Sequence, residues 1–430
     1  MDALNRFRNR RDQANRLRRF NRKLLAGDDE LRSIARCGNA LGNLVMVRQD
    51  QHGRTRPGGV ATCKSAWGCL GCAARKRAEH AARVKRLVDR HHDTGGHVSL
   101  GSFTLSHYRS DDLADLLEGL RKAFTDMRRM KAYKDAETEH GIVGWIGALE
   151  ITDGPSGWHP HLHVLFFHRE FLGVEYGDNA QLRSALHQTF AFQIDRHLGR
   201  QVHEIHGVDL VPVKTDSDDG AVARYLGKIQ LEMARQDLKT GRGQSRSPWE
   251  IALDAARTGD ARDTARWVEY LRSSKGRNVV THSKSLDQIY GTPTDKEIDA
   301  MLGIQDQPDD QTEDTDGDQD VASVDAAVWN DARDIITPDQ GSLVAAALTA
   351  LEDHGPEAMA ETFSRHLNHV EVTVHPETRL PNLRYRDRPD TITVATGDAD
   401  GESDRIDYDD LGPVARAWYG TAEPMTSERR

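Results

Sequence analysis

Residues 157–167 read Gly-Trp-His-Pro-His-Leu-His-Val-Leu-Phe-Phe, and this stretch decides the predicted fold. Because successive side chains of a strand point to opposite faces, His161 and His163 share one face while Leu162 and Val164 turn toward a core. Imidazoles placed in this way can bind one divalent metal ion, although several metals suit them. The plain alternative is a strand whose polar face happens to carry histidines. The stretch therefore predicts a β-strand with a candidate metal site.

The preceding apolar segment, residues 141–152, predicts a second strand. A Gly-Pro-Ser-Gly turn at residues 154–157 joins the two strands as a hairpin. Across such a hairpin Glu150 can lie beside the imidazoles of the facing strand. Two histidines and one carboxylate leave metal positions open for a substrate oxygen and water, as in catalytic sites. The alternative is an ordinary solvent-facing glutamate.

The order of the remaining elements predicts an α+β protein, a two-layer sandwich with a central antiparallel sheet. Strand-like segments alternate with amphipathic helices before and after the hairpin. The predicted strands are 97–106, 141–152, 157–167 and 202–213, and the predicted helices are 73–90, 111–131, 180–197 and 220–236.

A tyrosine and a lysine lie three residues apart on the predicted helix 220–236 and therefore share one face. Near a metal-bound phosphate, the phenolate of Tyr225 could attack phosphorus and form a covalent ester. Lys228 would favour the phenolate or hold a neighbouring phosphate. On spacing alone the two residues describe an ordinary pair on a helix surface.

Taken together, three motifs resemble those of the HUH endonucleases, in particular the rolling-circle plasmid replication initiators with one catalytic tyrosine. They are Phe103-Thr-Leu-Ser106, then Glu150 with His-Pro-His-Leu-His at 159–163, then Ala-Arg-Tyr-Leu-Gly-Lys at 223–228. The resemblance covers about residues 97–290 and includes a closing segment, His282-Ser-Lys-Ser-Leu286. It implies an enzyme that nicks single-stranded or cruciform DNA at a plasmid double-strand origin.

The resemblance also implies the role of each site residue. His161, His163 and Glu150 would bind Mg²⁺ or Mn²⁺ at the scissile phosphate, with His159 outside the ligand shell. Tyr225 would stay on the 5′ phosphate and free a 3′ hydroxyl that a polymerase extends. A host helicase and polymerase are the implied partners, and a dimer is possible.

One position departs from the family pattern. Relatives with one tyrosine carry a glutamate four residues before it, thought to activate water at termination, and Ala221 stands there in this chain. Asp218 or Asp219 could replace that glutamate, or a second copy of the protein could end the cycle. Initiation is therefore a firmer expectation than termination.

The cysteines are spaced C-x25-C-x5-C-x2-C and predict a structural zinc site. Cys63, Cys69 and Cys72 resemble half of a zinc knuckle, and Cys37 could supply the fourth thiolate. The alternative is buried or redox-inert thiols. The bases at residues 75–77, with the arginines of residues 1–36, could contact DNA phosphates or form a solvated helix face.

Charge and composition limit the class of protein. The 430 residues carry a formal charge of −10, but acids dominate residues 305–320 while arginines dominate the N-terminal part. No apolar run is long enough to span a membrane and no secretory signal begins the chain, so with four cysteines we expect a cytoplasmic protein.

The sequence suggests four regions. Residues 1–95 hold the basic arm and cysteines, 96–290 the endonuclease domain, 291–335 an acidic flexible linker and 336–430 a small C-terminal region of unknown role. Every motif precedes the linker, so we expect a fragment ending near residue 300 to fold and cleave. Two other functions stay open: an HUH relaxase or transposase, and a zinc-containing DNA-binding regulator without catalysis.

Overall fold

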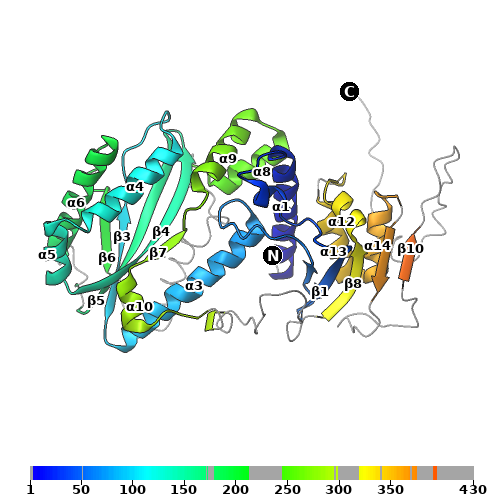
Figure 1. Cartoon of the computed structure of the whole chain (residues 1–430), viewed down its shortest axis with the longest axis horizontal. Coiled ribbons are helices and arrows are strands. Elements are labelled where there is room, and N and C mark those ends of the chain that lie inside the picture. The colour runs from blue at the N-terminus through cyan, green and yellow to red at the C-terminus, as the bar shows by residue number, and fades with distance from the viewer. Residues whose placement is uncertain are drawn as a thin grey trace, which may run out of the picture. The chain divides into compact units, whose positions relative to one another are not determined.

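The computed structural model describes residues 3–50, 52–170, 172, 179–212, 245–294, 297–298, 319–338, 341–368, 370–374 and 391–394. The chain divides into two compact units, residues 1–394 and 395–430, and all described residues belong to the first. The described strands form two five-stranded antiparallel sheets, with helices between and beside them (Figure 1). The predicted α+β class with an antiparallel sheet is confirmed.

The first sheet carries the histidine strand, and we name it the histidine sheet. Its strand order is β6-β3-β5-β4-β7. The predicted hairpin is present: β4 and β5 pair from Ile142↔His168 to Gly154↔Gly157. Gly157 adopts a φ of 92°, where an added Cβ would lie 2.8 Å from the backbone of Arg109. The strands are β3 (His97–Phe103), β4 (Ile142–Gly154), β5 (Gly157–His168), β6 (Val208–Pro212) and β7 (Val280–His282).

One face of the histidine sheet packs on a layer of helices. The leucines of α4 recur at helical spacing and are buried. The ring of Phe103 contacts those of Phe124 in α4 and Phe190 in α6, with centroids 5.7 and 5.1 Å apart. This layer and its neighbours are α4 (Leu113–Met127), α5 (Lys131–Glu139), α6 (Ala180–Leu198), α8 (Pro248–Thr258) and α9 (Ala261–Ser274).

Helices also cover part of the opposite face, the one that carries His161 and His163. Helix α3 (Leu70–Asp93) and helix α10 (Lys284–Tyr290) share a core with side chains of this face, including Ile146 and Leu165. Because β4 and β5 are long, the helices meet one half of their length. The histidines lie toward the other end of the strands, near the hairpin turn.

The second sheet, which we name the terminal sheet, joins distant parts of the chain. Its order is β10-β9-β8-β1-β2, and β1 pairs with β8 from Leu44↔Asp325 to Gln49↔Gln319 (Figure 1). Val45 and Val47 of β1 are fully buried in its core. Its elements are β1 (Leu44–Gln49), β2 (Thr55–Gly58), β8 (Gln319–Asp325), β9 (Val370–Val374), β10 (Thr391–Val394), α12 (Ala326–Ala332), α13 (Leu343–His354) and α14 (Pro356–Ser364).

This sheet changes the predicted division of the chain. The range predicted as a linker, 291–335, includes β8 and α12, so residues 319–335 are folded structure and not linker. Most of the acidic stretch, residues 305–318, lies outside the described residues. The short apolar run Val321-Ala-Ser-Val324 becomes a buried strand because β1, far away in the sequence, supplies its partner.

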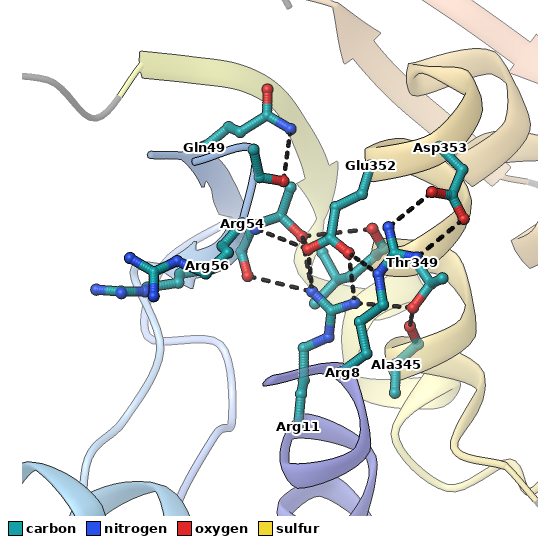
Figure 2. Close-up of polar contacts among 12 residues, drawn as sticks. Arg8, Arg11, Gln49, Arg54, Arg56, Ala345, Thr349, Glu352 and Asp353 are labelled. Atoms are coloured by element: carbon teal, nitrogen blue, oxygen red, sulfur yellow. Dashed lines mark hydrogen bonds and ion pairs between the residues drawn. The ribbon is translucent and has the colours of Figure 1, made fainter. Parts of the chain in front are cut away.

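The basic N-terminal segment forms helix α1 (Ala3–Leu24), preceding the short helix α2 (Arg32–Ala35). Leu17 is fully buried on one side of α1. Figure 2 shows Arg8 and Arg11 of α1 directed at Glu352 of α13, with N–O distances of 2.8 and 2.6 Å. These two arginines are engaged within the protein, so they do not belong to the expected phosphate-contacting surface.

Candidate active site and metal centre

The β4–β5 hairpin places the three predicted metal ligands on one face of the histidine sheet. Glu150 pairs with His161 across the hairpin, and His163 lies one step further along the same face. The His163 Nε2 and Glu150 Oε2 atoms are 2.9 Å apart. The rings of His161 and His163 are parallel within 2°, with centroids 6.1 Å apart. The site therefore presents two imidazoles and one carboxylate on one face of the sheet.

The surroundings fix these side chains. Glu150 is 5% exposed, and a buried carboxylate needs a cation or hydrogen-bond donors. The Ser102 Oγ of β3 lies 3.1 Å from Nδ1 of His163. A partner on one ring nitrogen determines which nitrogen faces the metal, so Ser102 would orient His163. A carboxylate with two imidazoles is a donor set that fits a divalent ion.

A third and a fourth histidine extend the row. The ring of His159 lies 3.8 Å from that of His161 and 4.4 Å from that of His107, measured between centroids. Burial, and then the nearby His107, lower the pKa of His159 to about 4. His159 is therefore neutral at physiological pH, next to the proposed ligands. Sequence reasoning missed His107, although it directly follows the Phe103-Thr-Leu-Ser106 motif.

The predicted nucleophile and its lysine, Tyr225 and Lys228, lie outside the described residues, as do Ala221, Asp218 and Asp219. The described chain resumes at residue 245. There Arg246 exchanges two backbone hydrogen bonds with Asp153, at 2.7 and 2.9 Å. Asp153 is three residues after Glu150, so the chain that follows residues 213–244 is attached close to the hairpin.

A network of ion pairs holds this attachment. The guanidinium of Arg266 donates to the buried Asp153 carboxylate at 2.5 Å and lies over the ring of Trp158. Arg246 donates to Asp263, which lowers the pKa of that carboxyl. Helix α8 then begins with a capping box of Ser247 and Glu250.

The four cysteines form the second candidate site. Their sulfur atoms all lie within 4.8 Å of one another. The Cys37 Sγ is 3.5 Å from that of Cys69 and 3.7 Å from that of Cys72. A tetrahedral zinc with Zn–S bonds of about 2.3 Å separates its sulfurs by about 3.8 Å. The predicted cluster of Cys37, Cys63, Cys69 and Cys72 thus has the geometry to bind a metal such as zinc.

Contacts among the four thiols divide their acidity, and they raise the pKa of Cys63 and that of Cys72. Contacts with the other thiols lower the pKa of Cys37 to about 7, and such contacts, with the charge of Arg18, lower that of Cys69. Arg333 donates to the Cys37 carbonyl at 2.6 Å, and its burial lowers its own pKa to about 10. A zinc ion with four thiolates carries two negative charges, which Arg18 and Arg333 are placed to offset.

Comparisons with known proteins identify the family of this chain. Residues 56–177, which include the whole histidine hairpin, match a family model described as "Replication protein". The chain is 30% identical over 314 residues to "Protein rep" of Streptomyces lividans, covering 57% of this chain and 67% of that protein. The chain therefore belongs to the Rep family of plasmid replication initiators.

A second relative aligns with a shorter part of the chain. "Neomycin resistance protein" of Streptomyces cyanogenus is 29% identical over 132 residues, covering 25% of this chain and 30% of that protein. No solved structure matches the chain significantly. Membership of the replication-protein family makes DNA the partner of this protein. Among the described residues, no helix has both the length and the apolar character needed to cross a bilayer.

Proposed function

We propose that this protein nicks one strand of DNA at a plasmid double-strand origin and so starts rolling-circle replication. The observation that carries the proposal is the meeting of Glu150, His161 and His163 on one face of the β4–β5 hairpin. This hairpin lies inside the segment that matches the replication-protein family. Paired strand histidines with a buried carboxylate are suited to hold a metal ion at a phosphate.

The proposed reaction is a phosphoryl transfer to Tyr225. Its phenolate oxygen bonds to phosphorus, the bond from phosphorus to the 3′ oxygen breaks, and that oxygen takes up a proton. The products are a 5′-phosphotyrosyl ester and a 3′ hydroxyl. Lys228 would favour the phenolate. Bound to Glu150, His161 and His163, Mg²⁺ or Mn²⁺ would supply positive charge for the phosphoryl oxygens.

The phosphotyrosyl ester conserves the bond energy, so the strand can be rejoined without another energy source. A host polymerase would extend the 3′ hydroxyl, and a host helicase would open the duplex. Because Ala221 cannot activate water, termination would need Asp218, Asp219 or a second protein copy. We assign a structural zinc ion to the cysteine cluster. We assign the catalytic activity to residues 96–290.

The test is formation of a covalent protein–DNA adduct on supercoiled plasmid and single-stranded origin DNA with Mn²⁺ or Mg²⁺. Tyr225→Phe, His161→Ala and His163→Ala should each abolish nicking, while His366→Ala, an exposed histidine outside the site, should not. Tyr225→Phe should still bind DNA, because it removes the nucleophile but little surface. An adduct formed by Tyr225→Phe would exclude the nucleophile, and wild-type activity in EDTA would exclude the metal site. Wild-type protein that binds the origin without nicking it would favour the non-catalytic regulator.

A further inference from the structure

A cavity of about 170 Å³ lies between α3, β4 and β7. Ile146 contributes to its floor from β4. Ile146 and Glu150 are four residues apart on the same strand, so they lie on the same face of the histidine sheet, about 13 Å apart along it. The cavity and the candidate metal ligands therefore share one surface of the protein.

The floor of the cavity is apolar. Val84 and Leu87 of α3 are one helical turn apart and line it together with Ile146, and all three side chains belong to the buried core. Val280 of β7 completes the floor and is partly buried. A planar ring that entered the cavity would cover this apolar surface.

The rim of the cavity is polar but balanced in charge. Lys76 and Arg83 contribute two positive charges, and Glu79 and Asp287 contribute two negative charges. The Lys76 Nζ already pairs with Glu79 at 2.8 Å. A balanced rim does not favour a small free anion such as phosphate. It suits a neutral ring with polar edges.

The rim also holds two imidazoles, His80 from α3 and His282 from β7, and the chain at Thr292 and Pro293. Burial, and then the charge of Lys76, lower the pKa of His80, so this ring is neutral at physiological pH. A neutral imidazole offers one hydrogen-bond donor and one acceptor, and the edge of a nucleobase offers the same two kinds of group. The His282 Nε2 is 2.9 Å from the Asp287 carboxylate, which holds that ring in place.

We propose that this cavity binds one nucleobase of the single-stranded origin DNA, within a few nucleotides of the nick. The inference rests on the proposed function, because a strand whose scissile phosphate lies at Glu150 and His163 runs on the face that holds the cavity. A base turned out of the strand can place its ring on Val84, Leu87 and Ile146 and its edge at His80. Recognition of displaced bases in this way is common among proteins that act on single strands. The cavity thereby gives the initiator a means to select sequence beside the nick.

The experiment measures binding without chemistry. Full-length Tyr225→Phe protein, without chelator and without added Mg²⁺ or Mn²⁺, is titrated with fluorescent single-stranded oligonucleotides of about 20 nucleotides from the origin, each with one abasic site at a different position. We expect one position near the nick to lose about tenfold in affinity, or about 1.4 kcal/mol, because the missing base no longer covers the apolar floor. A uniform series with no sensitive position would overturn the proposal.

Substitutions at His80 assign the sensitive position to the cavity. His80→Trp fills the cavity from its rim and His80→Ala removes the hydrogen-bonding edge, without altering the buried floor. In both variants the penalty of that abasic site should shrink, because the effects of two changes on one contact are not additive. His366→Ala is the matched control and should keep the full penalty. A penalty that both His80 variants retain would refute the assignment.

Two competitors separate the sources of a nucleotide. Millimolar deoxynucleoside triphosphate or inorganic phosphate should leave oligonucleotide binding and its abasic penalty unchanged. Removal of the penalty by the free nucleotide would make the cavity a free-nucleotide site, and removal by phosphate would make it an anion site; either would overturn the proposal. Since no cleavage is measured, a protein that failed to nick could still show the abasic pattern, so the two proposals fail separately.

Discussion

The two sheets of this protein are built alike and encoded differently. All strands of the histidine sheet come from residues 97–282, and its central pair is a hairpin closed by a short turn. The terminal sheet combines residues 44–58 with residues 319–394. Each is antiparallel with a buried apolar core. In the histidine sheet, local sequence defines both strands of the central pair. In the terminal sheet, a strand is defined locally, but its partner comes from a distant part of the sequence.

The strongest way to break this comparison is to remove the distant partner. A chain that ends at residue 300 lacks β8, β9 and β10, so Val45 and Val47 of β1 lose their cover. We now expect this fragment to aggregate, against the prediction from sequence, because an uncovered apolar edge strand pairs with other chains. A chain that ends at residue 394 keeps every described element and is the control. Gel filtration and near-ultraviolet circular dichroism distinguish them; a monomeric, cooperatively unfolding 1–300 fragment would show that the sheets are independent.

The cysteine cluster contacts elements that pack on each of the two sheets. Cys72 lies in the first turn of α3, which packs on the histidine sheet, and Arg333, which follows α12, bonds to the Cys37 carbonyl. Cys69→Ser should reduce bound zinc from about one ion per chain to almost none and lower the temperature of unfolding strongly. Elemental analysis and calorimetry measure both effects. Wild-type protein purified without chelator that holds no zinc would contradict the site.

Substitution of Glu352 tests how much its ion pairs with α1 stabilise the contact between α1 and the terminal sheet. Its side chain is 1% exposed and binds Arg8, Arg11 and Thr55. Glu352→Gln leaves the Arg11 guanidinium without its anion, while Arg8 keeps Asp353 at 2.7 Å, and should cost about 3 kcal/mol in the free energy of unfolding. The control Glu361→Gln breaks an exposed pair with Arg365 and should cost less than about 1 kcal/mol. Equal effects in urea unfolding would contradict the role of burial.

The contribution of Glu352 to the free energy of unfolding should depend on pH. Burial opposes the ionisation of Glu352, but its bonds to Arg11 and Thr55 prevail and lower its pKa below the ordinary glutamate value. Because the pKa of Glu352 is lower in the folded protein, its ionisation stabilises the fold at pH values above the ordinary glutamate pKa. This contribution is lost as the pH falls through the pKa of the folded state. The gap in stability between wild type and Glu352→Gln should therefore narrow from pH 7 to about pH 3. A gap independent of pH would show that packing, and not charge, is responsible.

The smallest expected effect concerns the histidine sheet itself. Ser102→Ala removes the hydroxyl at 3.1 Å from His163 Nδ1 and should weaken Mn²⁺ binding about tenfold with little loss of stability. Ser102→Thr keeps a hydroxyl and should restore part of the affinity. Ser110→Ala, at an exposed serine outside the three motifs, is the control. Electron paramagnetic resonance of free Mn²⁺ measures the affinity, and unchanged binding in Ser102→Ala would exclude the orienting role.

The histidine hairpin was predictable because its signals are local. Two apolar strands flank a turn with glycine and proline, and the second strand carries His161 and His163 at alternate positions. These local signals specify the pairing that places Glu150 opposite His161. The family resemblance added the order of the motifs. The chemistry assigned to Tyr225 stays a prediction, because that residue is outside the described part.

Other features could not be predicted because they depend on packing between distant segments. Ser102 has no signal of its own, since its contact with His163 requires the register of β3 on β5. The acidic composition before residue 320 concealed the strand β8 that follows. The arginines of α1 resembled a DNA-binding arm, and only the fold shows that Arg8 and Arg11 bind Glu352.

The pairing of β1 with β8 also has a consequence for how the protein is made. Val45 and its partner Val324 are 279 positions apart (324 − 45), so β1 leaves the ribosome long before β8 is synthesised. At about 5–20 residues per second, that strand waits on the order of 14–56 seconds for its neighbour. Contacts of such long range also slow folding after synthesis. Until β8 is made, one edge of β1 is therefore open to chaperones and to other nascent chains.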